Sequence, residues 1–140
     1  KAVLFNETIK NNVDYGENGK KKKTDKQIKE AIRVAQGTEF VEKMDGDYNA
    51  HIAQGGTNIS GGQKQRLSIA RAIARNPEIY IFDDSFSALD YKTDYKLRKD
   101  LKEYTKNVTS IIVAQRIGTV MHADKILVLD DGECVRNRNS

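Results

Sequence analysis

The spacing of apolar residues in the first half of the chain predicts helices. Thr24 and Gln27 have the spacing of a capping box, which marks the start of a helix. The apolar positions that follow at helical intervals are Ile28, Ala31, Ile32 and Ala35. Gly37 predicts the end of that helix, and Thr38 is expected to cap a second, short helix that reaches Met44.

A longer helix is predicted after residues 47–58, which are expected to form a loop. Ser60 and Gln63 have capping-box spacing at the start of this helix. Its buried positions are expected to be Leu67, Ala70, Ile73 and Ala74. Asn76-Pro77 ends it, because the residue before a proline avoids the helical conformation.

The pattern changes in the second half of the chain to alternating strands and helices. Residues 79–82 are continuously apolar, which predicts a central parallel strand buried on both faces. Residues 91–106 predict an amphipathic helix, with inward positions at Leu97, Leu101 and Tyr104. Another buried strand is predicted at 109–113, and residues 125–129 and 133–135 read as two strands joined by a turn.

These elements predict an α/β chain with a helical part over 1–76 and a partial, mostly parallel sheet over 77–140. A length of 140 residues with 38% hydrophobic content supports one modest core. Cys134 is the single cysteine, so the chain has no internal disulfide and suits a reducing compartment. No apolar run is long enough to span a bilayer.

The chain is mildly basic, with a net charge of +4 and a pI near 9.1. Four consecutive lysines, 20–23, contribute to this charge beside Gly16 and Gly19. A solvated loop is the preferred interpretation, and a phosphate or nucleic-acid patch is the alternative. No aromatic residues alternate with the lysines to stack on bases, so we expect no nucleic-acid partner.

Ser60-Gly61-Gly62-Gln63 is the first segment with candidate chemistry. A helix start carries free N–H groups and a partial positive charge, which favour phosphate. The two glycines allow a ligand to approach the backbone, and Ser60 adds a hydroxyl donor. For Gly-Gly alone, an ordinary glycine-bearing helix start is the favoured interpretation.

Asp83 and Asp84 end the apolar strand and are the second candidate. One carboxylate at such a strand end can hold Mg²⁺ through water, and another can orient an attacking water. The alternative is a plain acidic strand end or a helix cap.

These segments together resemble the latter half of an ATP-binding cassette, the motor domain of ABC transporters. The resemblance extends from Leu4 to Gly132 and is carried mainly by residues 59–66, 79–84, 87–90 and 114–116. It implies an ABC-type P-loop NTPase fold and a second nucleotide-binding domain as partner. It also implies ATP and Mg²⁺ as ligands of the complete dimer.

The resemblance implies a role for each motif. Residues 60–63 match the signature motif, which in this family closes over ATP held by the opposing domain. Asp83 matches the Walker B aspartate that holds Mg²⁺ through water. Asp84 stands where active members carry a glutamate, and Gln115 stands where they carry a histidine. Asp90 ends a D-loop motif at the dimer interface, and it is also expected to cap the following helix.

Asp84 and Gln115 depart from the pattern at the two positions most closely tied to hydrolysis. Aspartate is one methylene shorter than glutamate, which withdraws its oxygens by roughly a bond length (~1.5 Å). Misplacement by about 1 Å can cost on the order of a hundredfold in rate. Glutamine can hydrogen-bond but carries no charge. This combination resembles the degenerate half of a heterodimeric ABC exporter.

Residues 50–56 resemble the X-loop of exporters, which contacts the transmembrane domains, with Gln54 at the usual glutamate position. This likeness places the chain at the cytoplasmic face of the cell membrane. The glycine-rich P-loop pattern that cradles phosphates is absent from the chain. We therefore expect a fragment of a cassette that is inactive as an ATPase when isolated.

Two other classes of function stay open. One is a soluble ABC-type ATPase that acts on nucleic acid, although the chain lacks the expected coiled-coil insertions and aromatic-basic surface. The other is an interaction module without catalysis. Uncovered strand edges and apolar faces would also favour self-association of the 140-residue chain.

Overall fold

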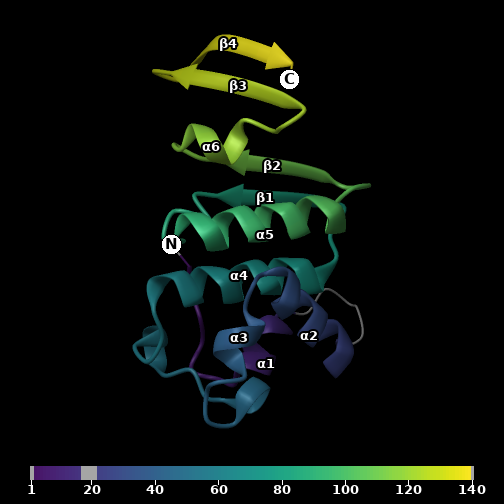
Figure 1. The fold of residues 1–140 in the computed structure, drawn as a ribbon, viewed down its shortest axis with the longest axis vertical. Helices are drawn as coiled ribbons and strands as arrows, with labels where there is room; N and C mark the ends of the chain where they lie inside the picture. The colour runs from purple at the N-terminus through teal and green to yellow at the C-terminus, as the bar shows by residue number, and fades with distance from the viewer. Residues whose placement is uncertain (1, 17–21, 140) are drawn as a thin grey trace.

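The computed structural model of the chain describes residues 2–16 and 22–139. Its elements are stacked along the long axis (Figure 1). Short helices lie at one end, α4 and α5 cross the middle, and the strands follow beyond α5. Lys20 and Lys21 of the predicted lysine loop lie outside the described residues.

The first part of the chain is helical. Its elements are α1 (Ile9–Val13), α2 (Asp25–Val34), α3 (Thr38–Val41), the 3₁₀ turns η1 (Asp47–Asn49) and η2 (Gln54–Gly56), and α4 (Gly61–Arg75). The predicted helices after residues 24 and 60 are confirmed. The short helix ends at Val41 rather than Met44, and the N-cap position is Gly37 rather than Thr38. The sequence pattern gave no prediction of α1.

The ends of α2 show how local sequence sets its length. Thr24 and Gln27 form the predicted reciprocal capping box at its start. At its end Gln36 adopts a left-handed backbone with φ of 59°, and Gly37 N–H donates to the carbonyl of Ile32 at 2.8 Å. A Cβ on Gly37 would lie 2.8 Å from Cγ2 of Ile32, so only glycine fits where the chain turns back.

The core lies between α2, α4 and the short helices and continues to α5. The largest fully buried apolar side chains are Ile9, Val13, Ile28, Ile32, Val34, Val41, Ile52, Leu67, Ile73 and Leu97. All predicted buried positions of α4 are buried, and Asn76 ends this helix in the left-handed conformation. Periodicity therefore located the core face of both long helices in the helical part.

The second part contains β1 (Ile79–Asp83), α5 (Tyr91–Tyr104), β2 (Thr109–Val113), α6 (Ile117–Val120), β3 (Lys125–Asp130) and β4 (Glu133–Asn139). β1 and β2 are parallel, with Ile79 opposite Thr109 and Asp83 opposite Val113. β3 and β4 form an antiparallel hairpin. Its two loop residues, 131 and 132, both have positive φ, as a type I′ turn requires.

The prediction that β1 and β2 are buried on both faces is wrong. Tyr80 and Phe82 of β1 are buried, but Ile79 and Ile81 are 56% and 68% exposed. In β2, Ile111 faces solvent in the same way. Among the described residues helices pack on one face of this sheet only, so a continuous apolar run did not mean burial on both sides.

The prediction for α5 is correct at two of its three inward positions. Leu97 and Leu101 are buried, whereas Tyr104 is 41% exposed. Tyr104 is the last residue of the helix, whose buried residues are Asp94, Leu97 and Leu101.

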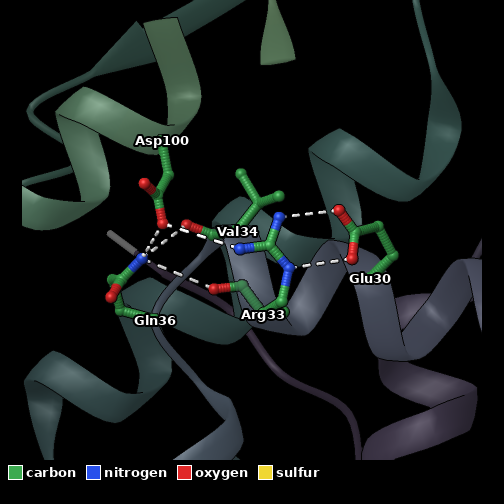
Figure 2. A network of polar contacts seen from close by, with 5 residues as sticks. All are labelled: Glu30, Arg33, Val34, Gln36 and Asp100. Atoms are coloured by element: carbon green, nitrogen blue, oxygen red, sulfur yellow. Dashed lines mark hydrogen bonds and ion pairs between the residues drawn. The ribbon is translucent and has the colours of Figure 1, made fainter. Parts of the chain in front are cut away.

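A polar network joins the helical part to α5 (Figure 2). Gln36 Nε2 donates to Asp100 Oδ2 at 2.7 Å, and the Arg33 guanidinium lies 3.8 Å from the same oxygen. Arg33 also pairs with Glu30 one turn earlier, at 2.7 Å. Arg66 of α4 donates to the backbone carbonyl of Gln36 at 2.8 Å. The turn after α2 is thereby held by both α4 and α5.

Candidate functional site

An open pocket of about 230 Å³ lies where β1 and β2 end. Because parallel strands present their carboxyl ends at one edge, the residues that follow them meet there. Asp84 follows β1, and Gln115 follows β2 after one intervening residue. Both line the pocket, together with Ser87 and Arg116. The two positions singled out from the sequence are thus brought together.

The backbone of Asp84 is held from two sides. Its N–H donates to the carbonyl of Val113 at 3.0 Å, and its own carbonyl accepts from Ser87 Oγ at 3.1 Å and from Gln65 Nε2 at 3.3 Å. Its φ is 47°, in the left-handed region that aspartate adopts more readily than most residues. The conformation is therefore fixed by both β2 and α4.

Asp83 is the last residue of β1, and its side chain is exposed. It does not belong to the pocket lining. The described residues contain no group of three or more His, Cys, Asp or Glu side chains that could enclose a metal. Mg²⁺ keeps several waters and needs only one or two carboxylates besides substrate phosphates, so a single exposed carboxylate such as that of Asp83 is compatible with this ion.

The predicted capping box at the start of α4 is confirmed. Ser60 Oγ accepts from Gln63 N–H at 3.2 Å, and Gln63 Oε1 accepts from Ser60 N–H at 2.9 Å. This pairing fixes the helix start and leaves the first backbone N–H groups, at Gly61 and Gly62, without intrahelical acceptors. Such a start is suited to an anion. Ser60 to Gln63 do not line the strand-end pocket.

Gly62 packs closely against the loop that follows β1. A Cβ there would lie 3.0 Å from the carbonyl oxygen of Ala88. At the end of this loop Asp90 caps α5, as predicted, by accepting from Thr93 Oγ1 at 2.7 Å and Thr93 N–H at 3.0 Å. These two hydrogen bonds, the side-chain one first, lower the pKa of the Asp90 carboxyl.

Two residues that sequence reasoning did not single out for this site hold the loop in place. Gln65 of α4 accepts from Ala88 N–H at 2.9 Å and donates to Ser87 Oγ at 3.0 Å. Arg116 donates to the carbonyl of Ser87 at 2.8 Å. Both lie within segments that carry the family resemblance, but nothing in composition or periodicity indicates where their side chains reach.

Residues 50–56 run beside the N-terminal segment. Ile52 is buried, and its N–H donates to the carbonyl of Glu7 at 2.9 Å. His51 is exposed and lies 2.8 Å from Asn6, from Nε2 to Oδ1. Gln54 is exposed as well. The segment thus has a buried edge that anchors it and an exposed side.

Comparison with known proteins agrees with these motifs. The ABC transporter family model matches residues 2–87. An ABC transporter ATP-binding protein of Mycobacterium tuberculosis is 44% identical over 135 residues, covering 96% of this chain and 23% of the relative. The ATP-dependent lipid A-core flippase of Vibrio cholerae is 42% identical over 132 residues, covering 94% of this chain and 22% of the flippase.

A solved structure has the same fold. A bacterial Atm1-family ABC exporter with ATP bound superposes with a TM-score of 0.91 at 33% identity, covering 99% of this chain and 24% of the exporter chain. The chain belongs to the ABC transporter ATP-binding family, and its relatives include exporter-type members. The predicted α/β fold of part of an ABC cassette is confirmed.

The chain spans about a quarter of the length of these relatives. None of the helices in the described parts of the chain is long and apolar enough to cross a membrane. Membership of the family implies binding of ATP and Mg²⁺ in general terms.

Proposed function

We propose that this chain serves in the nucleotide-binding domain of an ABC exporter that couples ATP binding and hydrolysis to transport. The lipid A-core flippase and the Atm1-family exporter among its relatives support this class of transporter. Residues 1–76 would form the helical subdomain and 77–140 the C-terminal part of the RecA-like core. The convergence of Asp84 and Gln115 on one strand-end pocket is the observation that carries the proposal.

The site at the strand ends is the chain's own nucleotide site, and it is degenerate. Asp83 would support Mg²⁺ through water, and Asp84 would orient the attacking water from a shorter side chain than glutamate. Gln115 offers a hydrogen bond to phosphate but no charge. These residues favour binding over rapid hydrolysis. The bound nucleotide supplies the phosphate on which this chemistry occurs.

The start of α4 acts on the other nucleotide of a dimer. Ser60, Gly61 and Gly62 present a hydroxyl and two backbone N–H groups, and Gln63 fixes them through the capping box. The chain would complete the ATP site of a second nucleotide-binding domain, and the D-loop ending at Asp90 would lie at the same interface. The partner's site would then carry most of the hydrolysis.

The exposed side of residues 50–56 is the proposed contact with the transmembrane domains. Its buried edge at Ile52 gives the segment a firm base, and Gln54 is available at the surface. This contact would place the chain at the cytoplasmic face of the membrane.

The test is a gain of function in the complete transporter pair. The double substitution Asp84→Glu with Gln115→His restores the side-chain reach and the ionisable group. We expect turnover at this site to rise at least tenfold, since misplacement by about 1 Å can cost on the order of a hundredfold. Single-turnover ATP hydrolysis with the partner's site inactivated measures the turnover at this chain's own site.

ATP occupancy by photo-crosslinking is the control for this experiment. An unchanged rate at normal occupancy would refute the degenerate-site assignment. Gly61→Arg provides the complementary test, because a Cβ there makes only an ordinary contact, 3.8 Å from Ala88 Cβ, and the side chain enters the helix start that the partner's ATP would contact. It should abolish hydrolysis at the partner's site while ATP bound at this chain's own site stays unchanged.

A further inference from the structure

The side chain of Gln65 makes three hydrogen bonds, all to the loop that follows β1. Its Oε1 accepts from Ala88 N–H at 2.9 Å. Its Nε2 donates to Ser87 Oγ at 3.0 Å and to the carbonyl of Asp84 at 3.3 Å. The loop 84–88 is therefore attached to α4 through one carboxamide, whose donor and acceptor are both used.

Gln65 stands five residues after Ser60 and one helical turn beyond Gly61 and Gly62. The proposed contact with the partner's ATP and the attachment to loop 84–88 thus lie on one short, rigid stretch of helix. A second contact strengthens this connection, because Gly62 abuts the carbonyl of Ala88 without room for a side chain. Displacement of the helix start must move the loop or break these contacts.

The loop in turn sets the backbone of Asp84. Its left-handed conformation is held by Val113 on the β2 side and by Gln65 and Ser87 on the other. Loss of the α4 contacts would leave Asp84, which lines the strand-end pocket, held by Val113 of β2 and by Ser87 within the loop itself. Gln65 itself does not line that pocket, so it can act only through the loop.

We propose that Gln65 is a positioning residue that couples the two ATP sites of the dimer. When the partner's ATP contacts this chain's signature motif, Gln65 transmits the change to the loop that places Asp84. This inference rests on the proposed function. Two substitutions separate its parts. Gln65→Leu removes all three hydrogen bonds at similar volume. Gln65→Glu keeps the acceptor for Ala88 N–H but loses the donor to Ser87 Oγ and to the Asp84 carbonyl.

The experiment compares hydrogen exchange in the complete transporter with and without a non-hydrolysable ATP analogue. In the wild type the analogue should protect both residues 60–63 and the loop 84–90. In Gln65→Leu, protection at 60–63 should persist while protection at 84–90 is lost. Gln65→Glu should keep part of the protection at 84–90. With the partner's site inactivated, ATP turnover at this chain's own site should fall roughly tenfold in Gln65→Leu with KM for ATP changed less than about twofold, because the side chain orients the loop rather than binding nucleotide.

Ser68→Ala is the matched control on the same helix. Its hydroxyl is buried without a hydrogen-bond partner among the described residues, so the change should leave both protection and turnover as in the wild type. If Gln65→Leu retains nucleotide-dependent protection of 84–90 and normal turnover, the coupling role is wrong. If the wild type itself neither hydrolyses ATP nor gains protection at 60–63, the proposed function fails first, and this inference falls with it.

Discussion

Gln36 and Asp100 are 64 positions apart, yet the Gln36 carboxamide donates a 2.7 Å hydrogen bond to the Asp100 carboxylate. Gln36 is the left-handed residue that follows α2, and Asp100 lies in the second half of α5. The contact therefore fixes the turn after α2 against the helix that packs on the sheet. Arg33 adds a longer ion pair to the same carboxylate, at 3.8 Å.

Asp100→Ala should lower the free energy of unfolding by about 1 kcal/mol. The hydrogen bond to a charged acceptor contributes most of this loss, and the half-exposed ion pair with Arg33 adds little. Asp100→Asn keeps an acceptor for Gln36 and should lose less than about half as much. Urea unfolding followed by circular dichroism measures both.

Glu30→Ala is the matched control, because it removes the other partner of Arg33 without affecting Gln36. This exposed pair one turn apart should contribute about 0.2 to 0.5 kcal/mol. Equal losses for Glu30→Ala and Asp100→Ala would contradict the assignment of stability to the hydrogen bond between α2 and α5.

Tyr80 should make the fold sensitive to alkaline pH. Burial, with a smaller contribution from the charge of Tyr104, raises the pKa of the Tyr80 phenol to about 12, whereas an unfolded tyrosine titrates near 10. The folded state thus holds this proton more tightly than the unfolded state. The contribution of the proton to the free energy of unfolding is complete below pH 10 and is lost as the pH rises to 12. Unfolding experiments between pH 10 and 12 should show the free energy of unfolding fall by about 2 to 3 kcal/mol.

Tyr80→Phe should remove most of this pH dependence relative to the wild type. Tyr104→Phe is the comparison, since it changes an exposed ring and leaves Tyr80 in place. Parallel stability curves for the wild type and Tyr80→Phe between pH 9 and 12 would mean that the Tyr80 proton is not linked to folding.

The elements that could be predicted from sequence are those fixed by local chemistry. The capping boxes at Thr24 and Ser60 were found because their partners lie three residues away. A turn was predicted at residues 130–132, and in the structure it lies at 131–132, where both residues have the positive φ that Asp-Gly favours. Asp84 and Gln115 were singled out separately from the sequence, and only the structure shows that both line one pocket.

Features that depend on distant neighbours could not be predicted. The apolar run 79–82 indicated a strand but not which of its faces is covered, and only Tyr80 and Phe82 are buried. Gln65 reaches loop 84–88 across 19 to 23 positions, a contact that no period in the sequence encodes. The hydrogen bond of Asp100 with Gln36 and its ion pair with Arg33 have the same long-range origin.

The left-handed backbone of Asp84 predicts which substitutions at this position destabilise the fold most. At φ of 47°, Asp84→Asn should leave stability within about 0.5 kcal/mol, because asparagine also adopts the left-handed region. Asp84→Val should cost about 1 to 2 kcal/mol or more, since a β-branched residue is strained there. Thermal unfolding of the two variants tests this order, and a similar loss for both would contradict it.

The exposed face of the β1–β2 sheet should drive self-association of the 140-residue chain. Ile81 and Ile111 are register partners on this face, 68% and 48% exposed, and Ile79 and Val113 extend the apolar surface. Contiguous exposed apolar patches promote association.

Ile81→Lys with Ile111→Glu places opposite charges side by side on solvent-facing positions, so it should shift sedimentation toward the monomer with little change in the free energy of unfolding. Phe82→Lys, on the buried face of the same strand, is the matched contrast and should unfold the chain. A wild-type chain that sediments as a monomer at every concentration and unfolds in one sharp transition would show that this face is tolerated in water.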